Sequence, residues 1–495
     1  MIEIWAHWPR WIAAVLTVFS VLLASHPSAS QSLQPSGWDA EIRLPEAPDL
    51  NPDPRVVEIE MEARVATVEL APGLAAEAWT YNGLLPGPLI RVNVGDRLIV
   101  RFTNSLPDST TIHWHGLRIP IEMDGVPGYS QAPVEPGASF TYDFVVPDAG
   151  IYWYHPHVMS AAQVGFGLYG AFLVEDPDED VGVSDDLVVL LSDIELTEDG
   201  VLESPNTGGS TGMAFGREGN HVLVNGKKFP SLTARSGAPQ RWRVINAAKS
   251  RYFKLAFDTG EARRFKKIGG DGGLLEYSVE LDQVVLGAGE RADVIVVPTA
   301  EPASHLTVVS LLHDRGYGST ELRDTSELID ITMADMPVYR SGPLPELRRN
   351  IVPFSTTGAT PVKLDLTLSQ DPLDKSFQYG INGVPFWDAT PVLANLGETQ
   401  LWTVENTTPW SHPLHLHGFF FLVLDENGQP VRPLEWKDTV DIPFEETRQL
   451  VVQFDDDRPG TWIFHCHILD HAGGGLLNAV HLGLPEEVFK PMAAH

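Results

Sequence analysis

Ten of the 17 histidines in this chain lie in four short clusters, HWHG, HPH, HPLHLHG and HCHILDH. Their members are His113 and His115, His155 and His157, His412, His415 and His417, and His465, His467 and His471. Residues two apart in a strand point to the same face, so each H-x-H presents two imidazoles side by side. This spacing suits one metal ion or two adjacent ones.

Cys466 is the only cysteine, and it stands between His465 and His467. In a strand the two histidines face one way and the thiol faces the other. One strand can therefore serve two metal sites that are joined by a few covalent bonds, an arrangement that favours electron transfer over hydrolysis. A lone cysteine forms no intramolecular disulfide, and a bound metal would explain how the thiol survives in an oxidising compartment.

The ligand types narrow the choice of metal. One thiolate with two imidazoles, here Cys466, His412 and His471, is the combination found at blue-copper sites. Zinc accepts the same ligands, but zinc has no redox chemistry, and a strand shared between two zinc sites would have no purpose. The other eight histidines of the clusters suit a group of three metals with open positions for a small oxidant.

The chain repeats one unit three times, as its turn signals show. The matched positions are Asn82-Gly83, Asn225-Gly226 and Asn382-Gly383, then Gly95, Gly237 and Gly397, then Asn104, Asn246 and Asn406. Apolar and polar residues alternate before each of the last three asparagines with the period of a strand. Three repeats at this spacing predict three related β-domains. Only the outer repeats carry a histidine nine residues after this last asparagine. Leu255 occupies the equivalent place in the middle repeat, which is therefore expected to be a spacer.

The length of 495 residues also predicts two or three domains. Short alternating runs broken by Gly, Pro, Asn and Asp predict an all-β fold of antiparallel sandwiches. Proline-rich and acidic linkers place a first domain with four of the clustered histidines at residues 45–177 and a second without ligands at 178–336. A third domain, with the other six clustered histidines and Cys466, is placed at 350–495. The Gly-rich segment Ser204–Asn220 is interpreted as a loop.

The first thirty residues are typical of a signal peptide. Arg10 precedes an apolar run from Trp11 to Ala24, and small residues at Ser28, Ala29 and Ser30 suggest cleavage near Gln31. The apolar run is short for a bilayer span, although an uncleaved anchor stays an alternative. We expect a periplasmic or secreted protein with no stable membrane insertion after processing.

The formal net charge is -32, which repels nucleic acid and anionic membranes. Neither is an expected partner. The acidic surface is interpreted first as a source of solubility, and alternatively as an attraction for cationic substrates or metal ions.

The four motifs, in this order, resemble the signature of the multicopper oxidase family, and the repeats resemble three consecutive cupredoxin-like Greek-key β-sandwich domains. The resemblance covers nearly the whole mature chain. It implies four copper ions: type 1 at His412, Cys466 and His471, type 2 at His113 and His415, and a type 3 pair at His115, His155, His157, His417, His465 and His467. It also implies one-electron oxidation of a reductant at type 1 copper and four-electron reduction of dioxygen to water at the trinuclear cluster.

Some positions depart from the family pattern. Leu476 stands where many members have an axial methionine, so we expect a type 1 site with three ligands and a raised reduction potential. Asp124 matches the family's acid near the cluster, where it can relay protons or simply form an Asp-Gly turn. Ala472 replaces a second acid of many bacterial relatives, and Asp470 is one position too early to be a confident substitute.

The positions of two further residues in the sequence predict their roles. Asp438, in W-K-D-T, is a candidate to support a ligand or to play a purely structural role. Trp114 lies between two ligands, and we expect it in the core.

The leading hypothesis is a monomeric, laccase-like oxidase of phenols or similar electron-rich organic molecules. A metal-ion oxidase acting on ferrous or cuprous ions in iron or copper homeostasis is the alternative, although only 8 methionines are scattered along the chain. A copper nitrite reductase lacks the doubled H-x-H clusters. A copper-free structural protein of this fold should show gaps in the ligand set, and this chain shows none. The sequence does not name the reductant, because loops form the pocket above type 1 copper.

Overall fold

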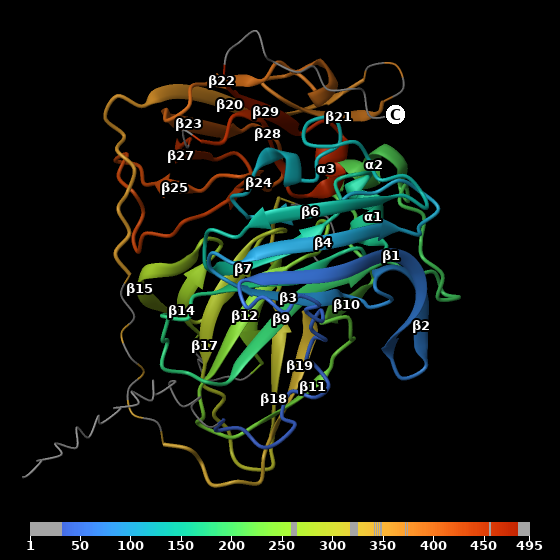
Figure 1. The fold of residues 1–495 in the computed structure, drawn as a ribbon, viewed down its shortest axis with the longest axis vertical. Coiled ribbons are helices and arrows are strands. Elements are labelled where there is room, and N and C mark those ends of the chain that lie inside the picture. The colour runs from blue at the N-terminus through green and yellow to red at the C-terminus, as the bar shows by residue number, and fades with distance from the viewer. Residues whose placement is uncertain are drawn as a thin grey trace, which may run out of the picture. The chain divides into compact units, whose positions relative to one another are not determined.

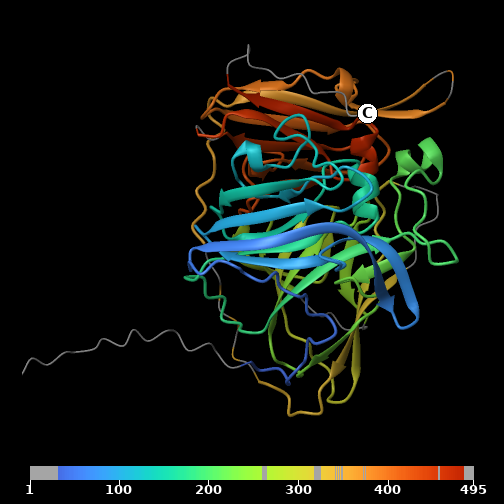
Figure 2. The ribbon, with the colours of Figure 1, turned by 45° about the vertical axis from the view of Figure 1, so that its right-hand side comes forward.

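The computed structural model describes residues 32–258, 265–316, 325–340, 342, 344, 346, 349–371, 373, 375–454 and 457–483. The predicted signal peptide at 1–30 lies outside these residues. From Ser32 onward the chain forms one unit. Strands dominate its described part, and the predicted all-β fold is confirmed (Figures 1 and 2).

The N-terminal third folds into two facing sheets with orders β2-β1-β4-β6 and β3-β8-β7-β5. Its strands are β1 (Val56–Ala71), β2 (Leu74–Tyr81), β3 (Gly87–Asn93), β4 (Arg97–Asn104), β5 (His113–His115), β6 (Ser139–Val145), β7 (Gly150–His155) and β8 (Gly170–Glu175), with the short helices η1 (Ile121–Met123) and α1 (Ser160–Gly165). The second sheet carries His113 opposite His155, because β5 pairs with β7 in antiparallel register.

The middle third forms sheets of order β10-β9-β12-β17-β14-β15 and β11-β19-β18-β13-β16. Its elements are β9 (Asp186–Ile194), α2 (Gly209–Phe215), β10 (His221–Val224), β11 (Ser231–Ala234), β12 (Gln240–Asn246), β13 (Phe253–Phe257), β14 (Phe265–Gly270), β15 (Gly273–Leu281), β16 (Val284–Leu286), β17 (Arg291–Val296), β18 (His305–Ser310) and β19 (Ser326–Met333).

The C-terminal third forms sheets of order β21-β20-β23-β27-β25 and β22-β29-β28-β24-β26. Its elements are β20 (Thr360–Gln370), β21 (Phe377–Ile381), η2 (Phe386–Asp388), β22 (Val392–Ala394), β23 (Thr399–Asn406), β24 (His412–Leu416), β25 (Phe421–Leu424), β26 (Thr439–Ile442), β27 (Thr447–Gln453), β28 (Gly460–Cys466), α3 (Leu469–Gly473) and β29 (Leu477–Leu482). Here β24 and β28 lie side by side, with His415 opposite His465.

The repeated asparagines explain why the three units share one sequence pattern. The side-chain amides of Asn104, Asn246 and Asn406 are buried, and each donates to two backbone carbonyls across a turn. Each side-chain oxygen accepts the backbone N–H two residues later. Because buried polar groups need such partners, asparagine is required at the end of β4, β12 and β23.

The Asn-Gly pairs form tight turns in all three units. Asn82, Asn225 and Asn382 have φ of 54°, 50° and 56°, and the glycine that follows each also has positive φ. This geometry is that of a type I′ turn, for which Asn-Gly is the preferred pair.

The middle unit and both outer units come together around the histidine strands. In Figures 1 and 2 the strands β1, β4 and β6 lie between the orange and red third unit and the green and yellow second unit. Strand β7 contacts β12, β14 and β17 of the middle unit, while α3 contacts both α1 and α2.

One local expectation was wrong. The segment Ser204–Asn220 was interpreted as a loop, yet it contains the helix α2. Gly208 and Gly216 take positive φ and bracket this short helix, which also contains Gly212 in its interior. The domain boundaries at 45–177, 178–336 and 350–495 stay a prediction.

Candidate metal centre

Three side chains of the third unit meet at one point in its interior. The thiol sulfur of Cys466 lies 3.4 Å from Nδ1 of His412 and 3.7 Å from Nδ1 of His471, and the two nitrogens are 3.0 Å apart. Strand β24 supplies His412, β28 ends at Cys466, and α3 carries His471. A single ion inside this triangle would have the trigonal His2Cys set of a blue-copper site.

The surroundings of this triangle hold its ligands in place. The Thr408 hydroxyl lies 2.7 Å from Nε2 of His412, which directs the other ring nitrogen toward the sulfur. The ring of Tyr379 lies 4.4 Å from that of His471. Burial lowers the pKa of His412 to about 3, with a smaller contribution from the Arg315 charge, so its imidazole is neutral at ordinary pH.

The helix α2 covers this triangle. The Tyr379 hydroxyl donates to the carbonyl of Ala214 at 2.6 Å, and the rings of Phe215 and Trp410 are 4.9 Å apart. His412, Cys466 and His471 are each 0% exposed. The segment that covers the triangle is therefore Ser204–Asn220, which was predicted to be a loop.

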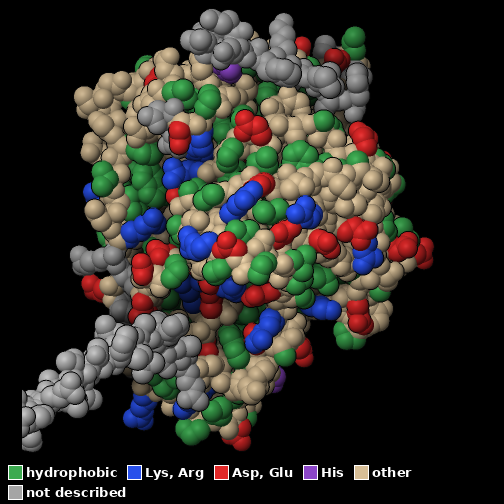
Figure 3. Space-filling model, in the orientation of Figure 1, with side chains coloured by type: hydrophobic (Ala, Val, Ile, Leu, Met, Phe, Trp, Pro, Cys, Tyr) green, Lys and Arg blue, Asp and Glu red, His purple; other side chains and the backbone are tan. Residues whose placement is uncertain are grey.

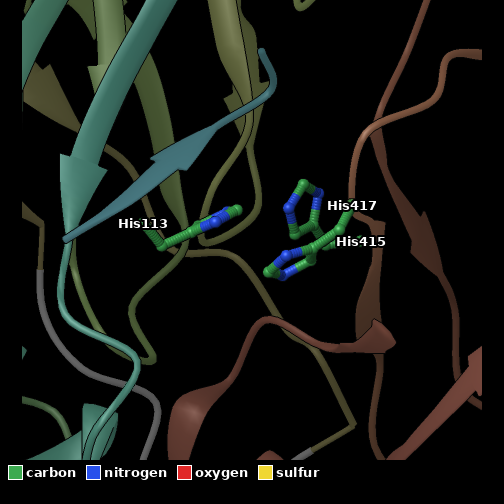
Figure 4. A group of neighbouring side chains, drawn as sticks. All are labelled: His113, His415 and His417. Carbon is green, nitrogen blue, oxygen red and sulfur yellow. The ribbon is translucent and has the colours of Figure 1, made fainter. Parts of the chain in front are cut away.

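The other eight histidines form a single group, here called the eight-histidine cluster, between the first and third units. They are His113, His115, His155, His157, His415, His417, His465 and His467. The ring of His113 stacks on that of His417 at 3.9 Å, and the ring of His115 stacks on that of His415 at 3.8 Å. Figure 4 shows His113 facing His415 and His417, which come from the opposite side.

The cluster has local subsets of three. His113, His415 and His417 can place one ring nitrogen each within 4.8 Å of one another, and so can His157, His417 and His465. The ring centroid of His467 lies 4.9 Å from that of His115 and 5.4 Å from that of His155. The ten histidines and Cys466 thus lie in one or the other of these two groups, and their roles as copper ligands stay a prediction.

The hydrogen bonds of the cluster fix which ring nitrogen is free. Nδ1 of His113, His155, His415 and His465 each bonds a backbone carbonyl, which can only accept. These rings therefore carry hydrogen on Nδ1 and a lone pair on Nε2. The Nε2 atoms of His113, His155, His157 and His415 are buried without a hydrogen-bond partner.

His115 is reversed. Its Nε2 lies 3.2 Å from both the Asp438 carboxylate and the Thr439 hydroxyl, and its Nδ1 is the atom without a partner. Buried polar atoms are nearly always satisfied, so several inward lone pairs in one place point to ligands of a metal. Outer hydrogen bonds that set the tautomer are typical of metal-bound histidines, and the residues therefore fit a group of copper ions.

Asp124 lies in a turn and also contacts the eight-histidine cluster. It follows η1 and precedes Gly125, whose φ is 79°, so it belongs to a turn. Its carboxylate also accepts a hydrogen bond from Nδ1 of His417 at 2.9 Å, although the two residues belong to different units. Its other oxygen, Oδ1, is buried without a hydrogen-bond partner.

Asp438 is a support for the cluster and not only a part of the fold. Its carbonyl accepts Nδ1 of His415 at 3.0 Å, and its carboxylate contacts His115. Burial alone would raise the pKa of Asp438, but the Arg291 guanidinium and the hydrogen bonds to it hold that pKa well below its usual range. Sequence reasoning missed Arg291, which belongs to the unit without ligands, so the expectation that the middle unit is only a spacer is incomplete.

The remaining predicted positions are also located. Leu476 is fully buried in the apolar cluster that contains Cys466. Asp470 pairs with Arg217 and accepts the Arg217 backbone N–H at 2.8 Å, so its carboxylate is engaged by the middle unit. Trp114 lies in the core of the first unit, as expected, where its ring packs on Tyr142 and Phe144.

Three sandwich units with a His2Cys triangle and an eight-histidine cluster define a cupredoxin-like metalloprotein, and comparison with known proteins agrees. Family models described as multicopper oxidase match residues 62–179, 185–326 and 355–482. The chain belongs to the multicopper oxidase family. It is therefore a copper-dependent oxidoreductase that uses dioxygen as its electron acceptor.

Individual relatives cover most of the chain. It is 30% identical to multicopper oxidase MmcO of Mycobacterium tuberculosis over 92% of both chains. It is 28% identical to a laccase of Bacillus subtilis, over 83% of this chain and 91% of that protein. The solved structure of a multicopper oxidase of Campylobacter jejuni, described as a metallo-oxidase, superposes with a TM-score of 0.75 at 27% identity, covering 89% of this chain and 94% of that one.

The buried histidines make the stability of the copper-free protein depend on pH. Burial lowers the pKa of His412 and of His465 to about 3, below the ordinary 6.5 of the unfolded chain. The unfolded state therefore binds more protons between these values, and stability falls as pH drops below 6.5, by about 1.4 kcal/mol per pH unit for each such histidine.

Denaturant unfolding of copper-free protein at a series of pH values measures this loss. Copper-loaded protein is the control, because a coordinated nitrogen takes up no proton and its loss should be smaller. A copper-free protein equally stable on both sides of the ordinary histidine pKa would contradict the prediction.

Proposed function

We propose that this chain is a laccase-like oxidase. It takes single electrons from small electron-rich organic molecules at His412, Cys466 and His471, and it reduces dioxygen at the eight-histidine cluster. In copper terms, type 1 copper is held by the triangle, type 2 by His113 and His415, and the type 3 pair by the remaining six histidines. Leu476 is the proposed axial neighbour of type 1 copper.

The observation that carries this proposal is the convergence of unpartnered ring nitrogens from two units beside the Cys466 triangle. Cys466 adjoins His465 and His467 in the chain, so the two sites are linked by a few covalent bonds. Four copper ions at these positions would supply one-electron chemistry at the first site and four-electron reduction of dioxygen to water at the second. The protein fixes tautomers, excludes water and provides the path between the sites.

Asp124 is the proposed proton donor of the cluster. Reduction of dioxygen to water consumes protons, and a carboxyl group at the cluster can deliver them. Oδ2 of Asp124 accepts a hydrogen bond from Nδ1 of His417, whereas Oδ1 has no hydrogen-bond partner and lies 3.3 Å from Nδ1 of His113.

Metal-ion oxidation is a second candidate function. It is favoured by the helix α2, which covers His412, Cys466 and His471. Since His412 and His471 are 0% exposed, an aromatic substrate cannot lie against either ring in this arrangement. A small ion needs less room, and the C. jejuni relative is described as a metallo-oxidase.

The proposed setting is the periplasm or the exterior of the cell, with the chain acting as a monomer. Within the described residues no helix has the length and apolar character that crossing a bilayer requires. On the face seen in Figure 3, acidic and basic side chains of the described residues are intermixed and no basic patch stands out among them. The net charge of the chain is -32, and this excess of negative charge supports the proposal that nucleic acid is not a partner.

The copper content and colour of the mature protein test the proposed sites. The parent should bind about four coppers and show the intense blue absorption of a thiolate-bound type 1 ion. Cys466→Ser should lose the blue band and most of the activity while keeping the type 2 electron-spin signal. A colourless parent with Cys466 intact would sink the proposal.

Replacing Asp124 by asparagine separates proton delivery from scaffolding. The amide preserves the size and the oxygen that accepts from His417 but cannot carry the proton. We expect kcat for oxygen consumption to fall by about 10²- to 10⁴-fold, with copper content and blue absorption unchanged. Asp148→Asn, at a surface ion pair with Arg118, is the matched control. Unchanged kcat in the Asp124 variant would leave this residue with only its turn role.

The reductant is tested with ferrous ion, cuprous ion and phenols of increasing bulk. If small organic molecules are the substrates, kcat/KM should fall by about tenfold or more between a small and a bulky phenol, because α2 limits the space. Phe215→Ala, which removes the contact with Trp410, should reduce this difference; Phe257→Ala, at a stacked pair elsewhere in the middle unit, should not. A kcat/KM for a metal ion far above that for every phenol, unaffected by Phe215→Ala, would favour the second candidate.

A further inference from the structure

The middle unit contributes a turn to the wall of the eight-histidine cluster. This turn, residues 287–290, joins β16 to β17 and lies between histidines of the two outer units. A Cβ on Gly289 would lie 2.8 Å from Cγ of His467 and 3.1 Å from Cε1 of His115. No side chain fits there, and Gly289 has a φ of +87°, which glycine adopts readily. The middle unit therefore touches the cluster directly.

Arg291 follows this turn and is 1% exposed. Its Nε donates to the carbonyl of Ile151 at 2.9 Å, on β7 of the first unit. Nη1 donates to the carbonyl of Gly289 at 3.0 Å and to Oδ1 of Asp438 at 2.7 Å. Nη2 donates to the other oxygen of Asp438 and to the carbonyl of Asp271 at 3.2 Å. Every N–H of the guanidinium has an acceptor, drawn from all three units.

Arg291 binds the carboxylate of Asp438, and this same carboxylate contacts His115. Because both oxygens of Asp438 are fixed by the guanidinium, Oδ1 is held 3.2 Å from Nε2 of His115. This contact keeps hydrogen on Nε2 and leaves the inward Nδ1 of His115 with its lone pair. The backbone carbonyl of the same residue fixes His415.

A second buried acid braces the same segment. Asp271 of the middle unit is 0% exposed, and its Oδ2 accepts the backbone N–H groups of Asp438 at 3.3 Å and Thr439 at 3.2 Å. Its Oδ1 accepts the backbone N–H of Arg291 at 3.0 Å. The residues W-K-D-T are thus positioned by the unit that supplies no ligand.

We propose that Arg291 is a positioning residue for the trinuclear copper site, acting through Asp438 to fix the orientation and tautomer of His115 and the position of His415. The proposal rests on the copper assignment under "Proposed function". Lysine cannot replace it fully, since an ammonium group lacks the planar fork that grips both carboxylate oxygens while reaching Ile151.

The test compares four variants of the full-length mature protein with the parent. Arg291→Met removes the charge and the fork, and Arg291→Lys keeps only the charge. Arg291→Met with Asp438→Asn removes both charges, so that no carboxylate is left buried without its partner. Arg241→Met is the matched control, because Arg241 is a buried arginine of the same unit that pairs with Asp293 and Glu179 instead.

The readouts are total copper per chain, copper affinity by competition with a chelator, the type 1 absorption and the type 2 electron-spin spectrum. We expect both Arg291→Met proteins to bind the cluster coppers about 10- to 100-fold more weakly with an altered type 2 spectrum, while the type 1 band persists. Arg291→Lys should recover part of the affinity, and Arg241→Met should match the parent.

Three results would overturn the inference. One is parental copper affinity and type 2 spectrum in the double variant, since Arg291 would then only neutralise Asp438. The second is parental behaviour of Arg291→Met itself. The third is an equal loss in Arg241→Met, which would indicate general loosening of the middle unit. A parent that binds no copper overturns the proposed function and this inference with it, and is recognised before any variant is made.

Discussion

The structure depends on holding eight imidazoles from two units in one buried space, where six of the rings have a nitrogen without a hydrogen-bond partner. Burial without a hydrogen bond costs about 1–3 kcal/mol for each such group, so the copper-free fold carries a large local penalty at this point. Like charges would add to it, and burial lowers the pKa of most of these histidines so that they stay neutral. In six of the eight rings, a hydrogen bond from the outer nitrogen to a backbone carbonyl or a carboxylate fixes the direction of the inner lone pair.

That constraint explains the architecture around the cluster. Histidines on β5, β7, β24 and β28 face one another only if the first and third units are held in fixed register. The middle unit supplies the brace through a set of buried charges, in which Arg291 pairs with Asp438 while Lys437 lies 3.3 Å from Asp271 and 3.2 Å from Glu290. A buried ion pair adds little to the free energy of unfolding, because the cost of desolvating both charges offsets their attraction. The pair of Arg291 and Asp438 instead fixes the position of the segment that orients His115 and His415.

Much of the site could be predicted from the sequence, since its ligands come in H-x-H pairs. His113 and His115 share one strand, whereas His157, His417 and His467 each lie just beyond a strand end. The repeat of buried asparagines likewise revealed three units, because each satisfies the same carbonyls in the same turn. Arg291 could not be found this way. It is the first residue of an ordinary strand, β17, and its partner Asp438 lies 147 positions away, so only the packing of three units reveals the contact.

The helix α2 was missed for a different reason. Its sequence GSTGMAF has two glycines within seven residues, and glycine disfavours a helix interior by about 1 kcal/mol relative to alanine. The helix exists because Ala214 is fully buried and packs with the apolar cluster of the third unit, while its carbonyl accepts the Tyr379 hydroxyl. Tertiary contacts decided the local conformation, and local composition could not show them.

The two carboxylates that touch the cluster are not equivalent, and this difference separates their roles. Both oxygens of Asp438 are held by Arg291, so a proton added there would have to displace a charged partner. Asp124 has no arginine or lysine partner among the described residues; its Oδ2 accepts from His417, and its Oδ1 has no hydrogen bond but lies 3.3 Å from Nδ1 of His113. An acid that must release and regain a proton needs an oxygen free to carry it. The geometry therefore suits Asp438 to orienting ligands, and it supports the proposal that Asp124 is the carboxylate that delivers protons to the cluster.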